Sequence, residues 1–499
     1  MDNLWSLLAR NVRNFPHSVA VNYPAEKRSL TWLELSDSSF RLAMQLKGLG
    51  IVPGDKVAAM FPNCPEFITA FYAVEYLGAV FVPINIRLTS QEIAYILADC
   101  DAKILLFAEE KREVAEESQT GSADLKLLSG REFGQGVEAL GEYLPSGLAQ
   151  AGDTAEILYT SGTTGKPKGV MLTHYAVISV AQMMAYEAGI YPGDNLLLLM
   201  PLTHSAPLNL FMVGGSWSGA TVTLGEFTPQ NILNLTQNEK VTHFFAAPIA
   251  YQLISRMPDL ANYDLSSMKY WIYGGAPAGR EQVLAWQQAL PGKFMSVYGL
   301  TEAGPNGMAL RHQEHAGKAG SIGNRGSVNA EMKILRMDGS EAANGEEGEI
   351  ALRSPSLMSG YYKKPDATAE AIKDGWLLTG DIARKDEDGY VWVLDRKKDM
   401  IISGGVNVYP KEVEDVLLTN PKILDAAVIG VPHADWGETV CAVVVIKPEM
   451  SFTQAELQEF CRGNLADYKI PKLLKVVPAL PRNSSGKLLK FVLRKEVGG

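Results

Sequence analysis

One segment of the chain is more informative about the fold than any other, and it reads Leu158-Tyr159-Thr160-Ser161-Gly162-Thr163-Thr164-Gly165-Lys166-Pro167-Lys168-Gly169. The apolar residues 157–159 predict a strand that runs directly into a loop of glycines, hydroxyl side chains and lysines. Glycines let backbone N–H groups turn toward an anion, and hydroxyl and ammonium groups add further donors. A flexible surface loop has a similar composition, but the preceding strand and the stiffening Pro167 favour a phosphate-binding loop. The spacing is not GxxxxGK[ST], so the segment is no Walker loop.

Around this loop, short β-branched runs alternate with amphipathic segments. Residues 56–61 predict a strand, residues 67–77 a helix and residues 79–82 the next strand, and the alternation returns at 103–107 and 221–224. Such alternation is typical of crossover units in layered α/β sheets, whose parallel strands direct their carboxyl ends at a ligand crevice.

The pattern changes near residue 395. A predicted strand at 391–394 runs into the charged stretch 395–399. The elements that follow are a helix from about residue 411, strands at 426–431 and 439–446, and a helix that opens with the capping-box pair Thr453 and Glu456. We therefore expect a large N-terminal domain of layered α/β sheets, residues 1–395, and a small C-terminal α+β domain, residues 396–499.

Composition narrows the class of protein. A chain of 499 residues is long for one hydrophobic core, and its 56 acidic against 46 basic residues disfavour nucleic acid as a partner. The four cysteines form no CxxC pair, which favours a reducing, cytoplasmic compartment. The most apolar run, residues 68–84, contains Glu75 and is short for a membrane span, so no integral membrane segment is expected.

The segment 158–169 strongly resembles the phosphate-binding signature of the adenylate-forming superfamily, which includes acyl-CoA synthetases, adenylation domains and luciferases. Six further segments resemble the other signatures of that family in the right order: Gly274-Gly275-Ala276-Pro277, Tyr298-Gly299-Leu300-Thr301-Glu302, Thr379-Gly380-Asp381, Asp395-Arg396-Lys397-Lys398, 403–410 and 481–487. Matches in series over essentially the whole chain make chance implausible.

The resemblance implies that a carboxylate attacks the α-phosphorus of ATP, with fixed cations and N–H donors stabilising the charge on phosphate oxygens. It implies ATP contacts from Thr160, Ser161, Gly162, Thr163, Thr164, Gly165, Lys168, Gly275, Ala276, Pro277, Tyr298, Gly299, Thr301, Asp381, Arg396 and Lys487. Glu302 and Thr160 are the implied Mg²⁺ ligands, since this hard cation prefers oxygen. The implied catalytic residues are Lys487, Thr301, Glu302 and His204.

The C-terminal signatures imply a moving domain. By resemblance, Lys487 is the adenylation lysine, a point charge on a long stem that reaches carboxylate and α-phosphate together. Lys398 is the implied hinge, and rotation about it would bring Gly404, Gly405 and Val406 to coenzyme A, where glycines permit close backbone approach.

The acyl pocket is expected near His204, Gly274, Gly299, Gly304 and Met308, a small and largely apolar set. The amino-acid-activating branch of the family usually keeps an aspartate near position 203 to bind the substrate ammonium, and none lies in 201–208, so the resemblance disfavours an α-amino acid as substrate. Two further histidines, His312 and His315, lie in a polar loop, and we expect both to be solvated.

The sequence thus predicts an ATP-dependent acid–CoA ligase, an AMP-forming acyl-CoA synthetase most like bacterial fatty-acyl-CoA ligases. A fatty acid is the favoured substrate, which would place the enzyme in fatty acid and lipid metabolism. The alternatives are an aryl-acid–CoA ligase, an acyl-AMP ligase that loads a carrier protein, and a luciferase-type oxidoreductase. The expected partners are a small carboxylic acid, ATP, Mg²⁺ and coenzyme A. Chain length, aliphatic against aromatic acid, pathway and a homodimer all stay open.

Overall fold

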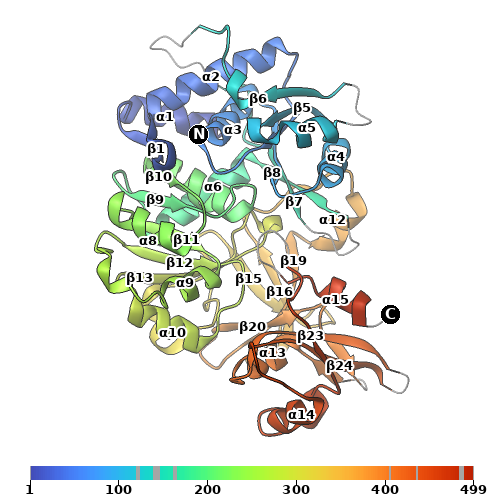
Figure 1. Ribbon diagram of the computed structural model, residues 1–499. Helices are drawn as coiled ribbons and strands as arrows, with labels where there is room; N and C mark the ends of the chain where they lie inside the picture. The colour runs from blue at the N-terminus through green and yellow to red at the C-terminus, as the bar shows by residue number, and fades with distance from the viewer. Residues whose placement is uncertain are drawn as a thin grey trace. The chain divides into compact units, whose positions relative to one another are not determined.

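The computed structural model describes residues 2–119, 124–138, 147–160, 166–403, 406–433, 436–482 and 488–497. The chain divides into two compact units, residues 1–332 with 352–377, and residues 333–351 with 378–499 (Figure 1). Each unit contains mixed α/β structure, so the predicted fold class is confirmed. This division follows compactness alone, and the domain boundary at 395/396 stays a prediction.

The first sheet of the larger unit has the strand order β17-β8-β7-β4-β3-β5-β6. Its strands are β3 (Lys56–Met60), β4 (Val80–Pro83), β5 (Ala102–Phe107), β6 (Lys126–Ser129), β7 (Thr154–Thr160), β8 (Lys168–Thr173) and β17 (Gly360–Tyr361). Strands β3 to β6 pair in parallel, and helix α3 (Pro65–Leu77) connects β3 to β4 as the alternating pattern predicts. Helices α4 (Ser90–Asp99) and α5 (Arg112–Ser118) contribute to the apolar cluster that covers this sheet.

The second sheet of this unit has the order β14-β13-β12-β11-β9-β10-β1-β2. Its strands are β1 (Val19–Tyr23), β2 (Arg28–Thr31), β9 (Asn195–Leu198), β10 (Thr221–Leu224), β11 (His243–Ala246), β12 (Tyr270–Gly274), β13 (Lys293–Tyr298) and β14 (Met308–Leu310). Strands β9 to β13 are parallel neighbours, as crossover connections require. Helices α8 (Pro229–Asn238), α9 (Pro248–Ile254) and α10 (Arg280–Ala289) contribute to one large aromatic core on this sheet.

Helices also connect the two sheets. Helix α6 (His174–Ala188) packs on β7 and β8 of the first sheet, whereas the π-helix η4 (Ala206–Val213) packs on β9 of the second. Helix α6 in turn packs on η4 and on α7 (Gly214–Ser218), so the space between the sheets is filled by helices. All residues of η4 after its first are buried.

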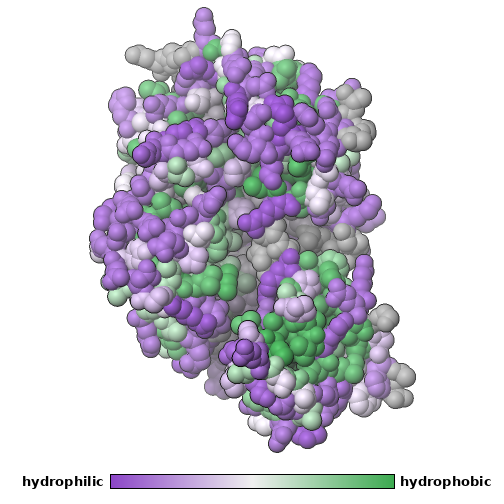
Figure 2. Space-filling view, in the orientation of Figure 1, coloured by the Kyte–Doolittle hydropathy of each residue, from purple (hydrophilic) through white to green (hydrophobic). Residues whose placement is uncertain are grey.

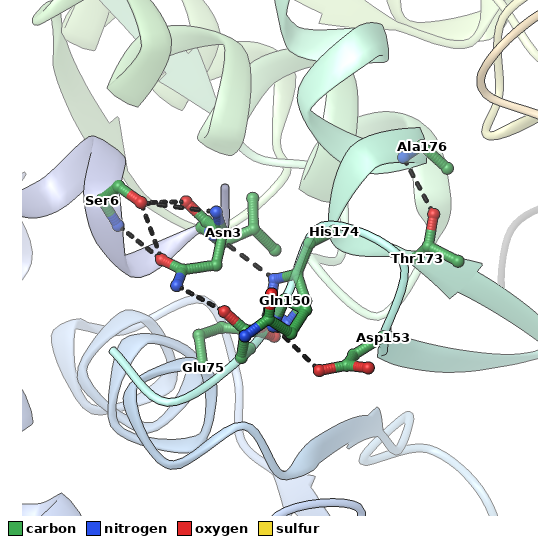
Figure 3. A network of polar contacts seen from close by, with 10 residues as sticks. Asn3, Ser6, Glu75, Gln150, Asp153, Thr173, His174 and Ala176 are labelled. Carbon is green, nitrogen blue, oxygen red and sulfur yellow. Dashed lines mark hydrogen bonds and ion pairs between the residues drawn. The ribbon is translucent and has the colours of Figure 1, made fainter. Parts of the chain in front are cut away.

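A buried polar network fixes the N-terminal segment on this unit (Figure 3). The backbone N–H of Leu4 donates to Nδ1 of His174 at 3.3 Å, and the Asn3 amide donates to the carbonyl of Ala149 at 2.9 Å. Glu75 Oε2 lies 3.3 Å from the same His174 nitrogen, and both side chains are fully buried. Burial raises the pKa of Glu75 well above its usual range and lowers the pKa of His174 to about 4. Burial thus disfavours the charged form of both side chains, which explains how Glu75 fits in an apolar helix.

The smaller unit contains a sheet of order β22-β21-β24-β23, with β25 added to β24. Its elements are β21 (Ile401–Ser403), β22 (Val406–Val408), β23 (Ile423–His433), β24 (Gly437–Ile446), β25 (Leu473–Val476), α13 (Pro410–Leu418), α14 (Gln454–Arg462) and α15 (Lys490–Val497). The capping box of Thr453 and Glu456 at the start of α14 is confirmed. A second sheet, largely of this unit, has the order β15-β16-β19-β18 with β20 on β19. Its strands are β15 (Glu331–Leu335), β16 (Glu347–Arg353), β18 (Ile372–Lys373), β19 (Trp376–Lys385) and β20 (Val391–Arg396). Figure 2 shows a hydrophobic area on this unit, in the region where Figure 1 labels β23 and β24.

Among the described helices, none combines the length and apolar character that a bilayer crossing requires.

Candidate active site

Three predicted segments follow parallel strands of the second sheet. The loop 275–277 follows β12, the loop 299–302 follows β13, and the segment 201–205 comes shortly after β9. Carboxyl ends of parallel strands meet at one edge of a sheet, where ligands collect in α/β folds. The structure therefore brings together segments that are up to a hundred residues apart in sequence.

Glycines at this edge are required by close backbone approach. A Cβ on Gly299 would collide with the carbonyl oxygen of Pro305, and one on Gly274 would collide with that of Val297. Gly304 adopts φ +91°, in the left-handed region that favours glycine, and a Cβ there would lie 2.6 Å from the carbonyl oxygen of Ser356. These glycines hold the loops close together, and their predicted role in the acyl pocket stays a prediction.

The phosphate-binding loop lies at the end of a hairpin. Thr160 is the last residue of β7 and pairs with Lys168, the first residue of β8, so the predicted strand before the loop is confirmed. Ser161, Gly162, Thr163, Thr164 and Gly165 lie outside the described residues.

Tyr361 links this hairpin to the nucleotide loop. Its hydroxyl donates to Glu302 Oε1 at 3.0 Å, and Lys168 Nζ lies 5.0 Å from the centre of its ring. Strand β17, which carries Tyr361, pairs with β8 of the hairpin. The structure thus brings the predicted residues Lys168 and Glu302 to opposite ends of one side chain that the sequence did not single out.

Thr301 has a neighbour that the sequence analysis does not single out. Its Oγ1 lies 3.1 Å from Oγ of Ser205, the buried residue directly after His204. The contact joins positions 96 residues apart, for which no local sequence signal exists. His204 itself has an Nε2 with no partner among the described residues, and burial lowers its pKa. A neutral imidazole therefore lies next to the residue that contacts Thr301.

The donor set around Glu302 suits Mg²⁺. Tyr361 bonds to one carboxylate oxygen, and the other has no hydrogen bond among the contacts of the described residues. Magnesium typically binds one or two carboxylates and completes its shell with water and substrate phosphates. One carboxylate with hydroxyl neighbours therefore fits the predicted ion, and no group of three metal-ligating side chains occurs in the described part of the chain.

The smaller unit joins the predicted ribose residues. Asp381 on β19 (Trp376–Lys385) pairs with Arg396 on β20 (Val391–Arg396), and Arg396 Nε lies 2.6 Å from Asp381 Oδ1. Asp381 is only 5% exposed, and Arg396 also donates to the carbonyl of Thr379 at 3.4 Å. Lys398 lies exposed in the turn after β20, and Val406 is exposed on β22. Gly404, Gly405 and Lys487 lie outside the described residues.

The prediction that His312 and His315 are solvated is wrong for His315. This side chain is fully buried, with Nε2 3.1 Å from the Tyr273 hydroxyl and Nδ1 2.8 Å from the carbonyl of Arg311. His312 is half-buried, and its Nδ1 accepts from the N–H of Phe294 at 3.2 Å. The polar neighbours in sequence hide the contacts to Tyr273 and Phe294, because these two residues lie on strands β12 and β13, about twenty to forty positions away.

Known proteins resemble the chain over its whole length. The model of the AMP-binding enzyme family matches residues 8–362, and that of the AMP-binding enzyme C-terminal domain matches residues 412–487. A feruloyl-CoA synthase from an Amycolatopsis species is 37% identical over 99% of both chains. The long-chain-fatty-acid–CoA ligase FadD13 of Mycobacterium tuberculosis is 34% identical, again over 99% of both. Among solved structures, the o-succinylbenzoate coenzyme A synthetase MenE from Bacillus subtilis, in complex with ATP and magnesium ion, matches with a TM-score of 0.89 and 31% identity over 100% of both chains.

Proposed function

We propose that the preferred substrate of this enzyme is a compact aryl acid. The chain belongs to the AMP-binding enzyme family. It is an AMP-forming acid–CoA ligase that uses ATP, Mg²⁺ and coenzyme A. The motif resemblance favours a fatty acid, with an aryl acid as its alternative. The side chains around the predicted pocket support the opposite order of preference.

The observation that carries the proposal is an aromatic stack behind the predicted pocket. The rings of Phe211 and Phe245 stack with centroids 5.3 Å apart and an interplanar angle of 25°. Phe245 lies on the same face of the sheet as Gly274, and its Cε2 is 3.4 Å from the position that a Cβ on Gly274 would take. Both rings are buried, and together they form an aromatic wall beside Gly274. A planar ring packs well against such a wall through ring contacts that an alkyl chain cannot make.

Similarity to a feruloyl-CoA synthase supports an aryl acid, because ferulate is one. The second candidate is a fatty acid, which the similarity to FadD13 supports. The test is a panel of cinnamate-type acids, benzoates, octanoate and palmitate, each with ATP and coenzyme A, scored by AMP release. We expect kcat/KM for the best aryl acid to exceed that for any alkyl acid by roughly tenfold or more, the scale of discrimination that pocket shape provides. The reverse order would favour the fatty acid.

A pocket variant separates the two candidates further. Phe245→Ala removes half of the stack and should raise kcat/KM for octanoate relative to the aryl acid. The matched control is Phe244→Ala, which removes the neighbouring ring on the opposite face of β11. The wall hypothesis fails if the two variants change the preference equally.

We further propose that the chain's residues act as their motifs imply. The carboxylate oxygen of the acid attacks the α-phosphorus and the bond to pyrophosphate breaks; the coenzyme A thiol then loses its proton, attacks the acyl carbon and releases AMP. The residues 160–165 with Lys168 would hold the phosphates, Glu302 with Thr160 would hold Mg²⁺, and Asp381 with Arg396 would hold the ribose. The ion pair between Asp381 and Arg396 supports the last assignment, since it places the two predicted ribose residues side by side and orients the carboxylate.

Lys487 would provide the positive charge for adenylate formation, and Gly404, Gly405 and Val406 would line the path of coenzyme A. Lys487→Ala should abolish adenylate formation while thioester formation from supplied acyl-adenylate persists. Equal loss of both half-reactions would refute this division of roles.

We also propose a cytoplasmic location, a hinge at Lys398 and a mobile domain from residue 396. The four cysteines are free and buried, which is compatible with a reducing compartment. Lys398→Pro should stiffen the hinge and slow the second half-reaction more than the first. A homodimer stays a hypothesis, to be tested by light scattering.

A further inference from the structure

The loop that follows β13 is held by donors from outside it. The carbonyl oxygens of three consecutive residues, Glu302, Ala303 and Gly304, each accept a hydrogen bond from another segment of the chain. The donors are the backbone N–H of Met358 at 2.9 Å, the hydroxyl of Ser356 at 2.7 Å and the side-chain amide of Asn209 at 3.3 Å. This short 3₁₀ turn has no long helix to fix it, so these donors set its position.

Asn209 differs from the other two donors in that it also bonds to a strand of the first sheet. It is fully buried on η4, and the same amide nitrogen also donates to Glu156 Oε1 at 2.6 Å. Glu156, also fully buried, lies on β7, which ends at Thr160 where the phosphate-binding loop begins. Ser205 directly precedes η4 and contacts Thr301. One amide therefore connects the strand before the phosphate loop, the helix beside the acyl pocket and the nucleotide loop.

The hydrogen bond between Asn209 and Glu156 defines the orientation of the Asn209 amide group. The Glu156 oxygen accepts a hydrogen bond, so the NH₂ group of Asn209 must face it, and the second N–H then points at the Gly304 carbonyl. A buried amide and carboxyl group are costly without partners, and an apolar pair of the same size would fill the space more cheaply. A buried polar pair that bonds to a site loop therefore points to positioning of that loop.

We propose that Asn209 is a positioning residue for the loop Thr301–Gly304, and that Glu156 fixes the orientation of its amide. This inference rests on the proposed role of Thr301 and Glu302 in binding the α-phosphate and Mg²⁺. Loss of the amide would let the loop shift and would weaken productive Mg²⁺–ATP binding. The second half-reaction, which consumes the adenylate, would be affected much less.

The test is Asn209→Leu, which keeps the size of the side chain and removes its hydrogen bonds. Acid-dependent exchange between ATP and pyrophosphate should show a half-saturating Mg²⁺–ATP concentration raised roughly tenfold, the effect of one buried hydrogen bond. Thioester formation from supplied acyl-adenylate should change less than about twofold, well below the effect of one such bond. If Asn209→Leu lowers the melting temperature strongly, Asn209→Ser, which is too short to bridge both oxygens, serves the same purpose.

The matched control is Asn11→Leu. Asn11 is also fully buried in this unit and donates to the Ser216 carbonyl at 2.7 Å, away from the loop. We expect it to lower stability without raising the half-saturating Mg²⁺–ATP concentration. The inference is overturned if both Asn209 variants leave that concentration unchanged, or if the control raises it equally. If wild-type enzyme shows no exchange with any acid, the proposed function fails instead.

Discussion

Replacing Glu156 by glutamine removes a titratable group from a fully buried position on β7 and keeps its shape. Burial raises the pKa of the Glu156 carboxyl from 4.5 to about 7, while hydrogen bonding from Asn209 lowers it in part. The folded protein therefore retains this proton to higher pH than the unfolded chain does. The free energy of unfolding then falls as pH rises from about 4.5 to about 7 and levels off above that range.

The size of this loss follows from the shift. Each pKa unit corresponds to about 1.4 kcal/mol, so a carboxyl moved from 4.5 to about 7 costs the folded state about 3 kcal/mol when it ionises. The variant lacks this cost. The difference in unfolding free energy, Glu156→Gln minus wild type, should therefore grow by about 3 kcal/mol between pH 4.5 and pH 8.

The assay is urea unfolding of both proteins at pH 4.5, 6, 7 and 8, followed by circular dichroism. Other titrating groups cancel in the difference, apart from Glu75, whose pKa the charge on Glu156 also raises. Exposed Glu281→Gln is the control for the replacement of a carboxyl group by an amide. A constant difference for Glu156→Gln as well would refute the argument, and a difference that shrinks with rising pH would mean that the folded state stabilises the charged form.

Three further outcomes are expected. Tyr361→Phe removes the hydroxyl that donates to Glu302 at 3.0 Å. Hydrogen bonds to charged groups contribute about 1.5–3 kcal/mol, so the half-saturating Mg²⁺ concentration should rise about tenfold. An unchanged Mg²⁺ dependence would contradict a role of Tyr361 in orienting Glu302. Asp381→Asn should raise KM for ATP by roughly tenfold with little change in KM for the acid, and equal changes in both would remove it from the ribose site. Lys490→Met breaks an ion pair of 2.8 Å in which both side chains are 11% exposed, so the free energy of unfolding should fall by about 3 kcal/mol in a denaturation experiment. Lys422→Met, which breaks an exposed ion pair, should lower the free energy of unfolding by at most about 1 kcal/mol. Similar losses for the two variants would show that burial does not decide the contribution of these ion pairs.

Local sequence was sufficient for much of the fold. The strands at 56–61 and 221–224 and the helix at 67–77 were predictable because hydrophobic period and burial agree along a short segment. The hairpin around the phosphate loop followed from a strand that ends in glycines and hydroxyls. In these places each residue's neighbours in space are also its neighbours in sequence.

The candidate site was predictable only where the backbone itself forms it. The roles of Ser205, Tyr361 and Asn209 depend on side-chain contacts that span 96, 59 and 53 positions, which no local pattern encodes. The prediction that His315 is solvated is wrong for the same reason, since its partner Tyr273 lies 42 residues away. Glu75 interrupts an apolar run as the sequence indicates, but the raised pKa of its carboxyl, which makes it tolerable there, depends on burial.

The formation of an acyl-adenylate before the thioester is tested most directly by acid-dependent exchange between ATP and labelled pyrophosphate. The exchange is measured before and after addition of coenzyme A. Exchange with a suitable acid is expected in the absence of coenzyme A, because the adenylate forms first and reversibly. Addition of coenzyme A should then release AMP and acyl-CoA in equal amounts. Release of ADP and phosphate, or thioester formation without any exchange, would contradict a reaction through an acyl-adenylate.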